Sequence, residues 1–178
     1  MRHASLLGLG VVLFLSGQAL TAGNRCCSAG ICELEGHHAF KGECDDSLWD
    51  HVYNHQRLEI HRCVAVTGTF VDATAGRAKD GCRHEADGDG HCFLKLAPGQ
   101  EQFLNAKNLS NEEGNLVFEP MCQYRVTQKD AMQVCKNWKQ AIALPPVGSR
   151  VRITGVFVTD LQHGHQELHP ISHIEVLK

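Results

Sequence analysis

The sequence predicts a small all-β barrel that contains one helix and is stabilised by disulfides. Three observations lead to this prediction. Several short runs are rich in β-branched residues and end at Gly, Pro or Asp, as strands do. One segment, residues 127–138, instead has apolar residues at helical spacing. All nine cysteines follow an apolar leader, which is typical of an exported chain whose cysteines form disulfides.

Length and composition limit the number of domains. The chain has 178 residues, of which 43% are apolar and 21% are charged, values typical of one globular domain with short appendages. We expect a signal peptide over residues 1–23, a Cys/His-rich N-terminal extension over 24–47 and the barrel domain over 48–178.

The first 23 residues read as a secretory signal. Arg2 precedes an apolar core from Leu6 to Leu15, and the small residues Ala22 and Gly23 follow. This core is too short to anchor the protein in a bilayer. We therefore expect no membrane anchor and an exported product, located in the periplasm or outside the cell. Without Arg2, the chain carries 16 Lys plus Arg against 20 Asp plus Glu. This acidic balance argues against nucleic acid as a partner.

The first half of the domain consists of strands and loops. Residues 63–71 are rich in Val and Thr and predict a first strand, followed by a polar loop over residues 72–90. Residues 91–96 predict a second strand, which ends before Pro98 and Gly99. Two shorter candidate strands follow, at residues 102–106 and 115–119.

The second half begins with the predicted helix. Thr127 and Asp130 have the spacing of a capping box, and apolar residues then recur at i, i+3, i+4 and i+7 up to Trp138. Residues 149–159 and 165–176 predict the last two strands. Three strands, a helix and two strands is the element order of an OB-fold, a five-stranded Greek-key barrel in which the helix lies between strands three and four.

Exported cysteines are expected to pair. Cys122 and Cys135 flank a short segment and are the best-supported pair; closing such a loop contributes about 3 kcal/mol in the chain-entropy model. Cys82 and Cys92 bracket the acidic part of the first long loop and form a second expected pair. Cys63 is then expected to bond to a cysteine of the leader, residues 26–44, and the odd total leaves one cysteine over.

Two segments carry potential metal ligands at every second position. His163, His165, Glu167 and His169 alternate near the C-terminus, and in an extended strand they would project from one side. The segment Asp87-Gly-Asp89-Gly-His91 has the same spacing, although its glycines are equally compatible with a turn. The alternative interpretation of both segments is a solvated polar surface.

The fold places both segments at the usual binding face. OB-fold barrels bind ligands on strands two and three, between the loop that joins strands one and two and the loop that joins strands four and five. We therefore predict a site on this rim that binds a divalent transition metal, with zinc expected, because imidazole with carboxylate suits such ions better than calcium or magnesium. Its predicted metal ligands are Asp87, Asp89, His91, His163, Glu167 and His169. Arg83, Phe93 and Asp160 are candidates for binding a ligand, and Glu85 or Glu167 for a general base.

Residues 48–176 resemble a family of exported OB-fold proteins whose biochemical role is unknown. The resemblance lies in Arg83-His-Glu-Ala-Asp-Gly-Asp89 and in Asp160, His163-Gly164 and Glu167-Leu-His-Pro170. It supports the domain limits and the Cys122/Cys135 pair, and it implies no activity. Members usually carry an aromatic residue where this chain has His165, so His165 is left out of the predicted ligand set. The chain also has a weaker similarity to thermonuclease-like OB-folds, in which an Asp-Gly-Asp turn holds a metal beside a phosphodiester; other motifs of that family are absent here.

Three functions remain open at this point. The first is an exported binding domain for a small ligand, a glycan or a protein, and it leads because no complete catalytic motif is present. The second is a metal-dependent hydrolase such as a phosphodiesterase or nuclease. The third is a polar cluster without a metal, in which His169 hydrogen-bonds Asp89 and joins the two loops.

Overall fold

The computed structural model describes residues 31–34, 37–40 and 43–178. The predicted signal peptide lies outside these residues, and the predicted N-terminal extension lies only partly within them. Within the extension, β1 (Ile31–Leu34) and β2 (His37–Phe40) pair as an antiparallel hairpin. In the described part of the chain, no helix combines the length and the apolar character needed to cross a membrane.

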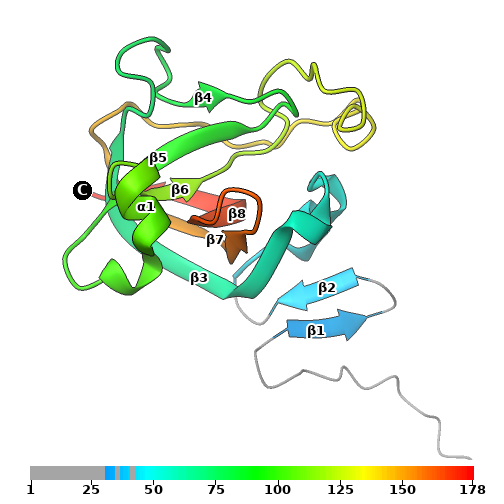
Figure 1. The fold of residues 1–178 in the computed structure, drawn as a ribbon, viewed down its shortest axis with the longest axis horizontal. Coiled ribbons are helices and arrows are strands. Elements are labelled where there is room, and N and C mark those ends of the chain that lie inside the picture. Colours follow the sequence, from blue (N-terminus) through cyan, green and yellow to red (C-terminus); the bar gives the residue numbers. More distant parts are fainter. Residues whose placement is uncertain (1–30, 35–36, 41–42) are drawn as a thin grey trace, which may run out of the picture.

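Five strands form a closed barrel (Figure 1). They are β3 (Leu58–Val71), β5 (Gly90–Leu96), β6 (Leu116–Phe118), β7 (Arg150–Asp160) and β8 (Gln166–Val176). Their order is β3-β7-β8-β6-β5, and β5 pairs with β3 to close the barrel. The pairing of β6 with β8 is parallel, and the other pairings are antiparallel. A short strand, β4 (Arg83–His84), is added at β5. The predicted five-stranded OB-fold-like barrel is confirmed.

Closure depends on the length of β3 and on Gly68. The 14-residue β3 pairs with β7 over most of its length and with β5 through residues 68–71. A Cβ atom at Gly68 would clash with the backbone oxygen of Lys95 and with the side chain of Leu94. Glycine therefore allows the two strands to approach where the barrel closes.

The disulfides reinforce two hydrophobic clusters. The interior of the barrel contains Val66, Phe70, Phe118, Ile153 and Leu168, together with the Cys82–Cys92 disulfide. A second cluster lies under η1 (Asp46–His51), a 3₁₀ helix that contributes the buried Leu48 and Trp49. Cys44–Cys63 and Cys122–Cys135 belong to this second cluster. The three pairs agree with the predicted ones and indicate an oxidising environment.

The predicted helix over residues 127–138 is wrong. The structure has successive turns there, in the segment drawn in yellow in Figure 1. Both Thr127 and Gln128 donate their backbone N–H groups to the carbonyl of Ala86, and Asn137 has a left-handed φ of 58°. These contacts and the Cys122–Cys135 disulfide override a local periodicity that has little packing to stabilise it.

The described α-helix lies earlier in the chain. The helix α1 (Ala106–Asn111) precedes β6, and η3 (Glu101–Phe103) precedes it, so the strand predicted at residues 102–106 is also wrong. Asn105 caps α1, because its side chain accepts from the N–H groups of Lys107 and Asn108. Its side-chain amide also donates to the carbonyl of Gly164, and thereby fixes α1 against the β7–β8 loop.

Candidate metal centre

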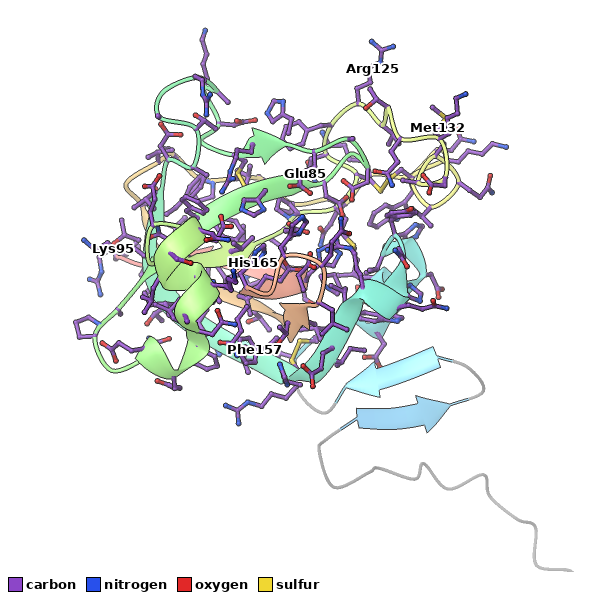
Figure 2. All side chains as sticks on the ribbon, viewed as in Figure 1. Glu85, Lys95, Arg125, Met132, Phe157 and His165 are labelled. Carbon is purple, nitrogen blue, oxygen red and sulfur yellow. A yellow bond between two sulfur atoms is a disulfide. The ribbon has the colours of Figure 1, made fainter. Side chains whose placement is uncertain are left out.

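A cavity of about 120 Å³ opens at one end of the barrel, and every residue that lines it is ionisable. The lining residues are Arg57, Arg83, Glu85, His91, Glu112, Glu119, Asp160, His163 and His165. Arg57 is the last residue of the 3₁₀ helix η2 (His55–Arg57), Arg83 lies in β4, Glu85 follows β4, and His91 lies in β5. Glu112 and Glu119 directly follow α1 and β6, Asp160 is the last residue of β7, and His163 and His165 lie in the β7–β8 loop. Glu85 and His165 lie near the middle of the view in Figure 2, whereas Lys95, Arg125 and Met132 lie at its edge.

His91 on β5 has carboxylates at both ring nitrogens. Its Nδ1 atom lies 3.3 Å from Oε1 of Glu119 and 3.5 Å from Oε1 of Glu85, and its Nε2 atom lies 3.0 Å from Oε2 of Glu112. Burial alone would lower the pKa of His91, but Glu112 and Glu119 raise the pKa to about 9. Glu85, His91 and Glu119 form a group whose potential ligand atoms all lie within 4.8 Å of one another.

Glu119, directly after β6, is the residue that these contacts share. Its carboxylate is buried and accepts from Nδ1 of His169 over 2.5 Å, while Arg57 Nη2 lies 3.7 Å away. Burial would raise the pKa of Glu119, but the hydrogen bonds and charges of His169 and His91 hold the pKa well below its ordinary value. Glu119 is therefore ionised and surrounded by cations.

A second group lies deeper in the barrel and consists of Asp89, Glu119 and His169. His169 is fully buried; its Nε2 atom lies 3.8 Å from Oδ2 of Asp89 and has no hydrogen-bond partner. The other oxygen of Asp89 accepts from the N–H of Cys122 over 2.7 Å. Burial raises the pKa of Asp89 to about 8, although the charge of His169 offsets part of this effect. Burial would lower the pKa of His169, but Glu119 raises it to about 9.

A third group, Asp160, His165 and Glu167, already contains a fixed cation. The Nη1 atom of Arg57 lies 2.5 Å from Oδ2 of Asp160 and 4.0 Å from Oε1 of Glu167. His165 lies 3.0 Å from Glu167 through Nε2. The guanidinium therefore already occupies the position of a cation beside Asp160 in this group.

An arginine and a histidine side chain flank the opening. Arg83 is 41% exposed, donates to Glu112 over 2.6 Å and lies over the ring of Phe93 at 4.9 Å. His163 is 58% exposed and lies 3.0 Å from Asp160 through Nδ1. Glu85 is also partly exposed, and burial followed by the charge of Glu119 raises its pKa to about 7.

The predicted site residues are brought to one end of the barrel but not into one metal shell. Asp89 and His169 share the second group, His91 belongs to the first and Glu167 to the third. Asp87 and His163 belong to none of the groups found among the described residues. Asp87 instead accepts from the N–H of Asp89.

The candidates for ligand binding and for a general base also have definite places. Arg83 lies at the opening, and Asp160 forms the ion pair with Arg57. Phe93 is 2% exposed, with His91 against it and Arg83 over it, so neither ring face is free for a ligand. Of the two predicted bases, Glu85 lines the cavity, whereas Glu167 is buried beside His165 and Arg57.

Sequence reasoning missed three cavity residues and left out a fourth. Arg57, Glu112 and Glu119 were not predicted, and His165 was excluded. The sequence did contain an indication of Glu119, because this residue directly follows the apolar run Leu116-Val-Phe. A charged residue at the end of a buried strand needs a partner of opposite charge. Arg57 and Glu112 lie in polar segments that give no comparable signal.

No protein-family model, curated protein or solved structure matches the chain. The fold and the site therefore define its class: a small, disulfide-stabilised β-barrel with buried His/Asp/Glu groups that could hold a metal ion.

Proposed function

We propose that this protein is an exported metal-binding domain that holds a divalent transition-metal ion, with zinc as the best fit, through Glu85, His91 and Glu119. The observation that carries the proposal is the spacing around Nδ1 of His91, which has carboxylate oxygens at 3.3 and 3.5 Å. Two ligands bonded at about 2.0–2.2 Å to one tetrahedral ion lie about 3.3–3.6 Å apart. Both distances from Nδ1 of His91 therefore match the spacing of ligands around a zinc ion.

The second nitrogen of His91 supports the same assignment. Histidine ligands of metals usually donate their other ring N–H to a carboxylate, which fixes the ring orientation and the tautomer. Nε2 of His91 lies 3.0 Å from Glu112, and Arg83 in turn donates to the same carboxylate. Glu112 and Arg83 thus orient Nδ1 toward Glu85 and Glu119.

The size of the cavity favours an ion over a larger ligand. Its volume of about 120 Å³ is below the roughly 300–1,000 Å³ of sites for drug-sized molecules. A groove of about 530 Å³ lies elsewhere, but Lys95 and Arg150 are the ionisable residues that line it, and it offers no His or carboxylate. The acidic cavity therefore fits a metal ion with its waters better than a sugar ring.

A metal-dependent hydrolase is the second candidate function. The observation that favours it is the incomplete shell: three protein ligands beside a cavity leave a coordination position for water. Catalytic zinc sites have this arrangement, and the ion lowers the pKa of the bound water so that it can attack an ester or phosphodiester.

Metal titration tests the proposal directly. Mature protein, exported through an oxidising compartment and purified without a histidine tag, is stripped with a chelator and titrated with Zn²⁺ by calorimetry. We expect stoichiometric binding that His91→Ala abolishes. The control His173→Ala removes an exposed histidine of β8 that lies outside every group and should bind as the wild type does. A folded wild-type protein that binds no Zn²⁺ would overturn the proposal.

A further inference from the structure

The groove of about 530 Å³ lies at the end of the barrel away from the candidate metal centre. Its volume falls within the roughly 300–1,000 Å³ of sites for small molecules. β7 begins at Arg150, which lines the groove, and ends at Asp160, which lines the metal cavity. A strand of 11 residues is roughly 30–35 Å long, so the groove and the metal cavity are separate sites.

Two cationic side chains lie on either side of one threonine in this groove. In the sheet register, Thr69 of β3 pairs with Lys95 of β5 and, on its other side, with Arg150 of β7. Residues that are directly opposite each other on neighbouring strands project to the same face of a sheet. Gly68 and Phe70 are buried, so Thr69 and its two exposed partners project outward from the barrel. An ammonium, a hydroxyl and a guanidinium group therefore form one row of hydrogen-bond donors.

No carboxylate neutralises this row within the described part of the chain. Neither Lys95 nor Arg150 takes part in an ion pair there, whereas Arg152, the next outward residue of β7, has Glu43 at 3.4 Å. Two like charges on neighbouring strands repel each other. A bound anion would relieve this repulsion, because an arginine can donate two parallel hydrogen bonds to one carboxylate and a lysine can donate a third.

The rest of the groove is largely apolar. Its apolar lining residues are Val71, Leu96, Ala97, Pro98 and Leu177. Val71 lies two residues beyond Thr69 on the same face of β3, and the backbone N–H of Leu177 donates to the carbonyl of Arg150. The apolar wall therefore lies beside the row of donors, and a ligand that fills the groove needs an apolar part as well as a negative charge.

The part of this wall that follows β5 is fixed against β3. The backbone N–H of Ala97 donates to the carbonyl of Thr67 over 2.9 Å. The side-chain amide of Gln100 donates to the hydroxyl of Thr67 and accepts from its backbone N–H over 3.0 Å. These hydrogen bonds flank Pro98 in sequence, so the wall is already in place before a ligand binds. Such preorganisation reduces the entropic cost of binding.

We propose that this groove binds an amphipathic organic anion, namely a carboxylate carried by an alkyl or aromatic body. The carboxylate lies against Lys95, Thr69 and Arg150, and the apolar body lies along the wall. None of these three residues lines the metal cavity, so the inference is independent of the proposed metal site.

Decanoate is a suitable probe, because it combines a carboxylate with an alkyl chain. Decyltrimethylammonium keeps the chain with the opposite charge, and inorganic phosphate keeps the negative charge without a chain. Calorimetry on the mature protein in the presence of a chelator measures binding without any contribution from bound metal. Lys95→Gln combined with Arg150→Gln removes both charges of the groove. The matched control, Lys129→Gln combined with Arg125→Gln, removes one lysine and one arginine from exposed positions elsewhere; Figure 2 shows Arg125 and Lys95 at different edges of the molecule.

We expect the wild type and the control variant to bind decanoate equally. The groove variant should bind decanoate about tenfold more weakly, because it loses charge-assisted hydrogen bonds. Decyltrimethylammonium and phosphate should each bind more weakly to the wild type than decanoate does. Circular dichroism checks that each variant is folded.

Four results would overturn the proposal. A wild type that does not bind decanoate, or a folded groove variant with unchanged affinity, would exclude the groove as the site. Decyltrimethylammonium that binds as tightly as decanoate would indicate an apolar surface only, and phosphate that does so would indicate a site for simple anions. A ligand-free wild type that sediments as a dimer, with a monomeric groove variant, would show that the groove is an interface between two copies of the chain.

Discussion

Nδ1 of His169 lies 2.5 Å from Oε2 of Glu119, and both side chains are buried. The parallel pairing of β6 and β8 explains this contact. Phe118 of β6 pairs with Leu168 of β8. Because the two strands run parallel, the residues that follow, Glu119 and His169, also lie side by side. Two residues that are 50 positions apart in sequence thus form a buried charge pair.

Removing one partner of this pair should be costly. His169→Ala leaves the Glu119 carboxylate buried with one cation fewer, and such unpairing costs about 3–5 kcal/mol of the free energy of unfolding. Urea unfolding of metal-free protein measures the effect. His173→Ala, at an exposed position of the same strand, should stay within about 0.5 kcal/mol of the wild type. A loss for His169→Ala no larger than that of the control would contradict the importance of the pair.

The stability of the metal-free protein should fall as the pH rises from about 6 to 9. The pKa of His169 is about 9 in the folded protein and 6.5 in the unfolded chain, so its contribution is complete below pH 6.5 and is lost as the pH rises through 9. Asp89 acts in the same direction, because its folded pKa of about 8 exceeds its ordinary pKa of 3.8. The folded state therefore binds more protons than the unfolded chain over this range.

Melting temperatures in a chelator, taken at half-unit steps from pH 5.5 to 9, measure this decline. We expect the melting temperature of His169→Ala to depend less on pH, because this variant lacks an imidazole that loses its proton over this range. Added Zn²⁺ should oppose the decline, since metal ligands bind in their deprotonated forms. A metal-free wild type that becomes more stable between pH 6.5 and 9 would contradict the protonated state of the cluster.

Glu112 should increase the Zn²⁺ affinity of the metal site without coordinating the ion. Glu112→Gln removes the charge opposite Nε2 of His91, and loss of such a carboxylate typically weakens metal binding 10–100-fold. Zn²⁺ competition with a chromophoric chelator measures the affinity, and the number of bound ions should not change. The control Glu113→Gln alters the exposed neighbouring residue and should leave the affinity unchanged. Equal affinities for the two variants would exclude an orienting role for Glu112.

The strands of the barrel were predictable because their signal is local. The runs that form β3, β5, β7 and β8 are rich in apolar and β-branched residues, and the structure places strands over each of them. The helix predicted over residues 127–138 was equally local, but hydrogen bonds to Ala86 and the Cys122–Cys135 disulfide bend that segment into turns.

The site was predictable only in part, because its geometry depends on contacts between distant segments. The alternation of His163, His165, Glu167 and His169 assumed one continuous strand, but β8 begins at Gln166. Glu167 and His169 both point inward from β8 and are buried, whereas His163 lies in the preceding loop and is exposed. Glu119 reaches His169 through the parallel pairing of β6 with β8, which no local pattern specifies.

The Cys122–Cys135 disulfide should stabilise the fold and also support the proposed metal site. The backbone N–H of Cys122 donates to Asp89, and Sγ of Cys135 lies 3.6 Å from the carbonyl oxygen of Asp87, so this disulfide contacts the loop that carries Asp89. Its loop spans 13 residues and that of Cys44–Cys63 spans 19. In the chain-entropy model, each disulfide contributes about 3 kcal/mol.

Replacing either pair by serines should therefore cost a similar amount of stability, with different effects on metal binding. We expect the double variant of Cys122 and Cys135 to bind Zn²⁺ more weakly, because the loop over residues 85–89, which carries the proposed ligand Glu85, is no longer held in place. The double variant of Cys44 and Cys63 is the matched control, since this disulfide joins the segment before η1 to β3 and not to the loop that carries Asp89. Urea unfolding and Zn²⁺ titration of both variants provide the comparison. Equal Zn²⁺ affinities in the two variants would show that the Cys122–Cys135 disulfide supports only the fold.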